Sequence, residues 1–354
     1  MFPNNKIIEI FSICDDFSKV FDKTLEQKAI PNCDSSKKRK YHRDGMMSDS
    51  EVMTILILFH DSGYRCLKHF YIQYVCKYMR HLFPKTVSYN RFVELERRAV
   101  VKLAVLVKQV LMGKCTGISF IDSTPLRVCK NQRILQHKTF RGIAQRGKCS
   151  MGWFYGFKLH IVCNEMGEIV NFMFTPGNVD DREPLKVAHF TEELYGKLVG
   201  DRGYISKDLF CKLFIDGIQL ITKLKNKMKN SLMSVSDKVI LRKRSIIETI
   251  NDELKNMAQV EHSRHRSFHN FVNNLMSGLA AYCFFPKNQC FSWNEKSITN
   301  SLSFGYFRRT HVNITSEQIT SHRLNHSSTN NSSMSSNSTP VSPLLKNFST
   351  NLSL

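Results

Sequence analysis

Two aspartates follow short apolar segments, a position from which carboxylates can bind divalent cations. Asp122 ends the segment 117–122, Gly-Ile-Ser-Phe-Ile-Asp, where a carboxylate is poorly solvated and costly unless a cation neutralises it. Asp201 follows the apolar residues 198–199 and lies between two glycines that let a ligand approach closely. If both segments are neighbouring parallel strands, their carboxyl ends meet at one edge of the sheet. Hard oxygen ligands there predict a magnesium site rather than a zinc site.

A third acid, Glu248, lies in a segment with helical periodicity. At about 100° per residue, one stripe carries polar residues and the opposite stripe is apolar. The polar stripe contains Arg244, Glu248, Asn251 and Lys255, and the apolar stripe contains Ile246, Ile247, Ile250, Leu254 and Met257. This places a carboxylate between two cations, on a face that could meet both a metal and a phosphate backbone. The alternative is an exposed face on which Arg244 and Glu248 pair at i, i+4.

The elements that must position these acids read as a mixed α/β domain over residues 113–286. Strand-like patterns cover residues 117–122, 157–163 and 169–175, with turn residues at 164–167 between the last two. A helix is expected over 180–195 with Asp180 and Asp181 in its first turn, followed by strands at 197–199 and 218–224. The order strand, strand, strand, helix, strand, helix, strand, helix is that of a ribonuclease-H-like fold.

Residues 1–112 read as helices joined by polar connectors. Ser48 and Glu51 have the spacing of a capping box, and Ser88 could cap a helix that carries Arg91. Two interpretations stay open: a helix-turn-helix whose last helix meets DNA, or a small bundle with a solvated basic face. Residues 287–354 are rich in Ser and Asn and predict a disordered polar tail.

The charge balance points to a polyanionic partner. The chain of 354 residues has 51 Lys and Arg against 30 Asp and Glu, which is a net charge of +21. An excess this large indicates nucleic acid and excludes an acidic solvating protein. Many cations lie between the first two strands, from Arg127 to Lys148, and a basic run covers residues 37–43. Both are expected to contact phosphate.

The cysteines and the hydropathy pattern suggest where the chain works. Eleven Cys occur singly without a CxxC motif, as expected for reduced thiols in a cytoplasm. The N-terminus reaches Asp15 and Asp16 before a signal-peptide core could form. No stretch approaches the twenty or so apolar residues that span a bilayer. We therefore expect a cytoplasmic, nucleoid-associated protein with no membrane partner.

Three motifs together resemble a known family. Arg244-x3-Glu248-x6-Lys255 is similar to the signature around the catalytic Glu of DDE transposases from bacterial insertion sequences. With residues 120–124, Phe-Ile-Asp-Ser-Thr, and 200–204, Gly-Asp-Arg-Gly-Tyr, it resembles most the insertion sequence 982 family. The resemblance spans roughly residues 48–286 and extends to segments 175–181 and 261–267. Leu241 stands where related families carry Tyr, and the tail after Pro286 departs from the family.

The resemblance implies a transposase that cleaves at the ends of its own element and joins the 3′-hydroxyl ends to target DNA. It implies two Mg²⁺ or Mn²⁺ ions, with Asp122 bridging both, Asp201 holding one and Glu248 the other. DNA at the terminal inverted repeats and at the target would be the partner, and bringing two ends together suggests a homodimer or larger homo-oligomer. The expected DNA contacts are Arg244, Lys255, Arg202, Arg264, Arg266, Arg127, Lys158 and Arg91.

Two other functions fit the same residues. One is a catalytically inactive DNA-binding copy that occupies terminal repeats as a repressor. The other is a metal-dependent nuclease on the same fold that cuts but does not join.

Overall fold

The computed structural model describes residues 2–28, 45–223, 233–261 and 265–285. Three features expected from the sequence lie outside these ranges: the basic run 37–43, Arg264 and the tail 287–354. Across the described ranges, no helix is both long and apolar enough to cross a membrane.

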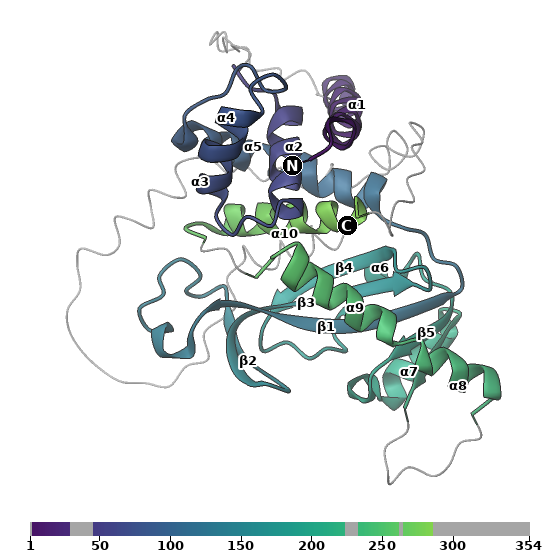
Figure 1. The fold of residues 1–354 in the computed structure, drawn as a ribbon. Coiled ribbons are helices and arrows are strands. Elements are labelled where there is room, and N and C mark those ends of the chain that lie inside the picture. The colour runs from purple at the N-terminus through teal and green to yellow at the C-terminus, as the bar shows by residue number, and fades with distance from the viewer. Residues whose placement is uncertain (1, 29–44, 224–232, 262–264, 286–354) are drawn as a thin grey trace, which may run out of the picture.

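A mixed six-stranded sheet forms the centre of the molecule (Figure 1). Its hydrogen-bonded order is β2-β3-β1-β5-β6. β4 pairs with the same edge of β3 as β2 does, but farther along that strand. The pairs β1–β5 and β5–β6 are parallel, whereas β3 is antiparallel to β1, β2 and β4. The strands are β1 (Ile118–Cys129), β2 (Gln145–Cys149), β3 (Gly152–Asn164), β4 (Ile169–Pro176), β5 (Gly196–Gly200) and β6 (Ile218–Thr222). A mixed α/β architecture was the prediction, and it is confirmed.

Helices cover both faces of the sheet. On one face a separate apolar cluster joins Ile121 and Val162 to Phe190 of α6 and Leu213 of α7. The other face shares one larger core with α9, α10 and the N-terminal helices. The helices that follow β4 in the chain are α6 (Ala188–Thr191), α7 (Lys207–Ile215), α8 (Val235–Arg242), α9 (Ser245–Asp252) and α10 (Phe268–Cys283). Short 3₁₀ segments lie at Asn131–Arg133, Pro184–Lys186 and Arg202–Tyr204.

The described residues before β1 form helices only. They are α1 (Asn4–Lys28), α2 (Asp49–Asp61), α3 (Leu67–His69), α4 (Cys76–Tyr78) and α5 (Tyr89–Leu106), with π-helical turns at Phe70–Val75 and Val107–Leu111. Ser48 and Glu51 make the expected capping box of α2, and the Ser88 side chain caps α5. These caps satisfy backbone N–H groups that the first turn leaves without partners.

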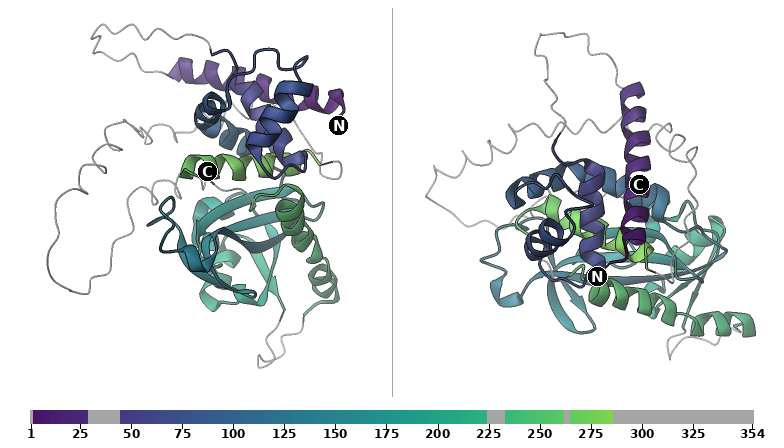
Figure 2. Two further views of the ribbon diagram at one scale, coloured as in Figure 1. Left: turned by 60° about the vertical axis from the view of Figure 1, so that its left-hand side comes forward. Right: turned by 45° about the horizontal axis from the view of Figure 1, so that its top comes forward.

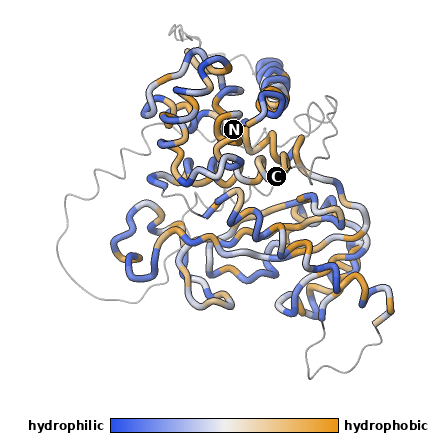
Figure 3. The backbone as a smooth tube through the Cα atoms, viewed as in Figure 1, coloured by the Kyte–Doolittle hydropathy of each residue, from blue (hydrophilic) through white to orange (hydrophobic). Residues whose placement is uncertain are grey.

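α10 connects the helical part to the sheet. It packs against α2 and α5, while its Phe271 stacks on Phe157 of β3 and its Tyr282 hydroxyl donates to the Gly167 carbonyl. Figure 2 shows α10 between the N-terminal helices and the strands. In Figure 3 this layer is largely hydrophobic, whereas the loop from β1 to β2 is mainly hydrophilic. A helix that follows the sheet in sequence therefore completes the core of the N-terminal part.

Three expectations about elements were wrong in detail. β1 continues past Asp122 to Cys129 because β3 pairs with it from Ser119 to Cys129. A sixth strand, β2, pairs with the first residues of β3 and was not expected. The region 180–195 contains the short 3₁₀ segment and the four-residue α6 in place of one helix. Pro184 and the pairing of Asp180 with Arg182 favour a turn at its start.

Candidate active site

Asp122 and Asp201 lie where β1 and β5 separate. The parallel pairing runs from Ile118–Lys197 to Phe120–Val199 and then stops. Asp122 lies two residues after Phe120 on β1. Asp201 lies two residues after Val199, just past the end of β5. β5 ends at Gly200, while β1 continues against β3. The separation of the two strands therefore brings the two carboxylates to the same edge, as the sequence pattern predicted.

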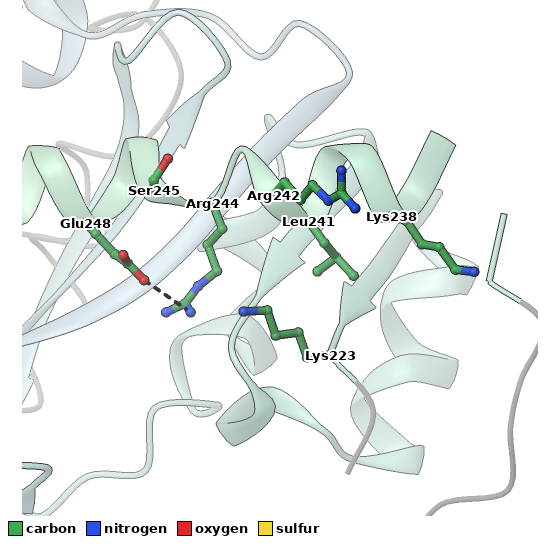
Figure 4. Close-up of a pocket in the computed structure, with 7 residues that line it drawn as sticks. All are labelled: Lys223, Lys238, Leu241, Arg242, Arg244, Ser245 and Glu248. Carbon is green, nitrogen blue, oxygen red and sulfur yellow. Dashed lines mark ion pairs between the residues drawn. The ribbon is translucent and has the colours of Figure 1, made fainter. Parts of the chain in front are cut away.

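Arg244 brings the third acid to this edge. Its guanidinium lies 3.7 Å from Asp122 Oδ1, 3.5 Å from Asp201 Oδ1 and 3.4 Å from Glu248 Oε1. Figure 4 marks the contact with Glu248. Three carboxylates from β1, the loop after β5 and α9 thus surround one cation. All three distances exceed those of a close hydrogen-bonded ion pair, so Arg244 neutralises the group without binding one member tightly.

α9 faces the sheet through its apolar stripe. Ile247, Ile250 and Leu254 are buried, and Glu248 is exposed on the other side. Met257 was expected in the apolar stripe, but it is 52% exposed. A π-helical turn over Glu253–Met257 follows α9, and its wider turn rotates later residues away from the α-helical stripe. The helical periodicity therefore predicts the face correctly only as far as Leu254.

Asp122 is the most buried of the three acids. Its side chain is 23% exposed, against 52% for Asp201 and 60% for Glu248. Burial raises the pKa of Asp122 to about 6, although the Arg244 guanidinium and the Ser123 backbone N–H act in the opposite direction. The negative charges of Asp201 and Glu248 raise this pKa further. Without added positive charge, the site therefore disfavours the ionised form of Asp122.

The polar groups at this edge suit a hard divalent cation. The donor set is three carboxylates, the ligand type that Mg²⁺ and Mn²⁺ prefer. Asn251 donates from Nδ2 to Asp122 Oδ2 at 3.1 Å, while its buried Oδ1 has no hydrogen-bond partner. Within the described ranges, no three His, Cys, Asp or Glu side chains are grouped closely enough to hold one ion as they are arranged here. Arg244 lies among the carboxylates that would have to do so.

A basic pocket opens beside the acids (Figure 4). It has a volume of about 460 Å³, and both Arg244 and Glu248 line it. The other lining residues are Lys223, Lys238, Leu241, Arg242 and Ser245. Sequence reasoning did not select Lys223, Lys238 or Arg242. The i, i+4 spacing of Lys238 and Arg242 just before Arg244 was the available signal.

The other predicted DNA contacts differ in exposure and in whether the cation is paired with an acid. Arg127, Arg202 and Arg266 are exposed. Lys255 lies 3.9 Å from Glu261, and Arg91 pairs at 2.6 Å with Glu94 on the exposed surface of α5.

Lys158 does not suit a DNA contact. Its side chain is 12% exposed, and its ammonium donates at 2.9 Å to both the Val179 carbonyl and the Asp181 carboxylate. Asp181 was expected in the first turn of a helix over residues 180–195. In the structure it pairs with Lys158 instead. The Lys158 ammonium is therefore held by the protein's own acceptors and does not point to DNA.

Comparison with known proteins adds one family match. Residues 112–268 match the family described as "Transposase DDE domain". This range begins shortly before β1, ends at the first residue of α10 and contains Asp122, Asp201 and Glu248. No curated protein sequence matches the chain.

One solved structure is similar over most of the chain. It is titled "Cryo-EM structure of piggyBac transposase synaptic complex with hairpin DNA (SNHP)". The TM-score is 0.40 at 11% sequence identity, covering 96% of this chain and 89% of that one. These values are too low to transfer a ligand or an assembly to this chain.

Proposed function

We propose that the chain is a DNA transposase with a ribonuclease-H-like catalytic domain of the DDE type. It would cleave DNA at the ends of its own element and join the exposed 3′-hydroxyl groups to target DNA. The observation that carries the proposal is the contact of Arg244 with Asp122, Asp201 and Glu248. These acids are far apart in sequence and come from three different elements. The family match over residues 112–268 supports the same function.

In this proposal the three carboxylates would hold two Mg²⁺ or Mn²⁺ ions, and these ions would supply a clamp for the attacking and leaving oxygens of an in-line displacement. Asp122, the most buried of the three acids, would help to hold both ions. Arg244 contacts the acids and also lines the basic pocket. It can therefore neutralise the carboxylates in the metal-free protein and bind a phosphate once other cations neutralise them.

The pocket suggests where the DNA backbone runs. Lys223, Lys238 and Arg242 line the same pocket as Glu248. Cations that line a pocket beside the acids favour binding of the phosphates that flank the scissile one. Transposition joins two element ends, so we further propose that the active form is a homodimer or larger homo-oligomer on DNA.

Cleavage and joining assays test the proposal. The full chain is incubated with a labelled duplex that carries the terminal repeat of its element, together with target DNA and Mg²⁺ or Mn²⁺. We expect nicked and joined products, and we expect Asp122→Asn, Asp201→Asn and Glu248→Gln each to abolish them while leaving DNA binding intact. Asp208→Asn is the matched control, because Asp208 is exposed on α7 on the opposite face of the sheet.

Each outcome of the assay identifies one function. Cutting without joining would indicate a nuclease, and binding without cutting would indicate an inactive DNA-binding copy. Cleavage that survives any of the three substitutions would refute the assignment of the acids.

A further inference from the structure

The β2–β3 ribbon combines strong positive charge with exposed apolar side chains. Residues 126–156, which run from the second half of β1 through the connecting loop and β2 into β3, contain seven Lys and Arg and not one Asp or Glu. Near the tip of the ribbon, Met151 is 82% exposed and Trp153 is 57% exposed. The ribbon extends from the sheet at the side opposite α8 (Figure 1). Exposed apolar side chains on so basic a surface indicate a contact that uses both properties.

The Trp153 side chain is presented by well-anchored backbone. Lys148 is its direct cross-strand partner, and the Asn131 amide donates to the Trp153 carbonyl at 2.8 Å. In the middle of β2, a Cβ on Gly147 would lie 2.1 Å from the Gly177 carbonyl oxygen, so the strand is packed tightly against the turn after β4. The indole therefore projects from a ribbon that is held on both strands.

Two cations accompany the indole ring. The guanidinium carbon of Arg146 lies 5.9 Å and the ammonium nitrogen of Lys148 lies 6.0 Å from a Trp153 ring centroid. Both are at the outer limit of a cation–π contact, so neither is bound tightly by the ring. A ring with two loosely held cations beside it matches a nucleotide, which offers a base to stack and a phosphate to neutralise.

We propose that the β2–β3 ribbon is a nucleic-acid-binding element in which Trp153 stacks on a base while Arg146 and Lys148 bind the adjacent phosphates. The proposal rests on the proposed function only in taking DNA as the partner. A second copy of the chain is the other candidate occupant. A two-fold contact through the ribbon would place this acid-free surface against itself, and like charges oppose that arrangement.

The ribbon would contact DNA away from the site of cutting. Asp122 pairs with Ile161 on β3, and Trp153 precedes Ile161 by eight residues. At about 3.3 Å per residue, this is about 26 Å along the strand. That length corresponds to about eight base pairs at about 3.4 Å each. Trp153 thus adds a contact well inside the bound DNA.

Tryptophan fluorescence can test the stacking directly. The chain has two Trp, so Trp293→Phe leaves Trp153 as the only one. This variant is titrated in EDTA, where cleavage cannot occur, with a 30-mer single strand, a 30-bp duplex and a 30-mer of abasic sugar-phosphate. We expect strong quenching by at least one base-containing probe and little by the abasic strand, which has the same charge. Equal quenching by all three probes would overturn the stacking.

Binding of variants gives a second measurement. For the probe that quenches, Trp153→Ala should weaken binding at least about five-fold, the low end for loss of one stacked base. Phe214→Ala should leave binding unchanged, because Phe214 is an exposed aromatic, 66% accessible, on α7. Replacing both Arg146 and Lys148 by Ala should reduce the slope of log K against log salt by about 1.4 to 1.8. Unchanged binding by Trp153→Ala would refute the proposal.

The oligomeric state distinguishes nucleic acid from a second copy of the chain as the partner of the ribbon. Light scattering without DNA should give the same mass for the wild type and for Trp153→Ala. A lower mass for the variant would assign the ribbon to a contact between copies and overturn the nucleic-acid assignment. These outcomes are independent of catalysis. If the Trp153 variant binds DNA normally while the wild type cleaves DNA, only the proposed binding role of the ribbon is refuted. If quenching depends on the bases but the wild type does not cleave DNA, only the proposed transposase activity is contradicted.

Discussion

Replacing Asp122 by Asn should make the metal-free protein more stable at neutral pH. Burial raises the pKa of this carboxyl from 3.8 to about 6 in the folded chain. The folded state therefore holds the proton more strongly than the unfolded state, and stability falls as the pH rises from about 4 to about 6. The raised pKa corresponds to about 2 pH units at about 1.4 kcal/mol each, or about 3 kcal/mol.

The size of the effect depends on pH in a defined way. At pH 7.5 the ionised carboxylate costs the wild type the full amount, so Asp122→Asn should gain up to about 3 kcal/mol in free energy of unfolding. At pH 4 the folded carboxyl is protonated and the unfolded one is about half protonated, so the gain should shrink to about 0.5 kcal/mol. An Asn side chain can still accept the hydrogen bond from Asn251 that Asp122 Oδ2 now accepts.

Urea denaturation of both proteins in EDTA at the two pH values measures this difference. The control is again Asp208→Asn, an exposed acid for which we expect similar stability to the wild type at both pH values. Adding Mg²⁺ at pH 7.5 should stabilise the wild type more than Asp122→Asn, because a bound cation favours the ionised carboxylate. An equal change at both pH values, or a less stable Asn variant at pH 7.5, would refute the reasoning.

Two further predictions concern buried charge. Arg244→Gln leaves three carboxylates without their shared cation, so it should lower the thermal midpoint in EDTA, and Mg²⁺ should restore more of the loss than Na⁺ at equal ionic strength; equal restoration by both salts would argue against a divalent site. Glu96 is buried on α5, and burial raises its pKa to about 7, so its ionisation destabilises the fold as the pH rises from about 4.5 to 7. Glu96→Gln should therefore gain up to about 3 kcal/mol at pH 8.5 but little at pH 4, and urea denaturation that shows no such pH dependence would contradict this.

The sequence alone was enough to select the three acids that converge on Arg244. Asp122 and Asp201 could be chosen because each follows an apolar segment, and Glu248 because helical periodicity separates its stripe from the apolar one. These patterns are local, since strand alternation and helical spacing involve residues only a few positions apart. The mixed sheet, the capping box of α2 and the N-cap of α5 were predictable for the same reason.

The contacts between distant segments were decided by tertiary structure. The continuation of β1 to Cys129 depends on pairing with β3, and the orientation of Met257 depends on a π-helical turn. Lys158 looks like any other cation in the sequence until Asp181 is folded against it. Likewise, Trp153 is an ordinary strand residue until β2 brings Arg146 and Lys148 beside its ring. Local patterns state which residues share a face, but only packing between segments far apart in the chain determines which charges meet there and which remain free.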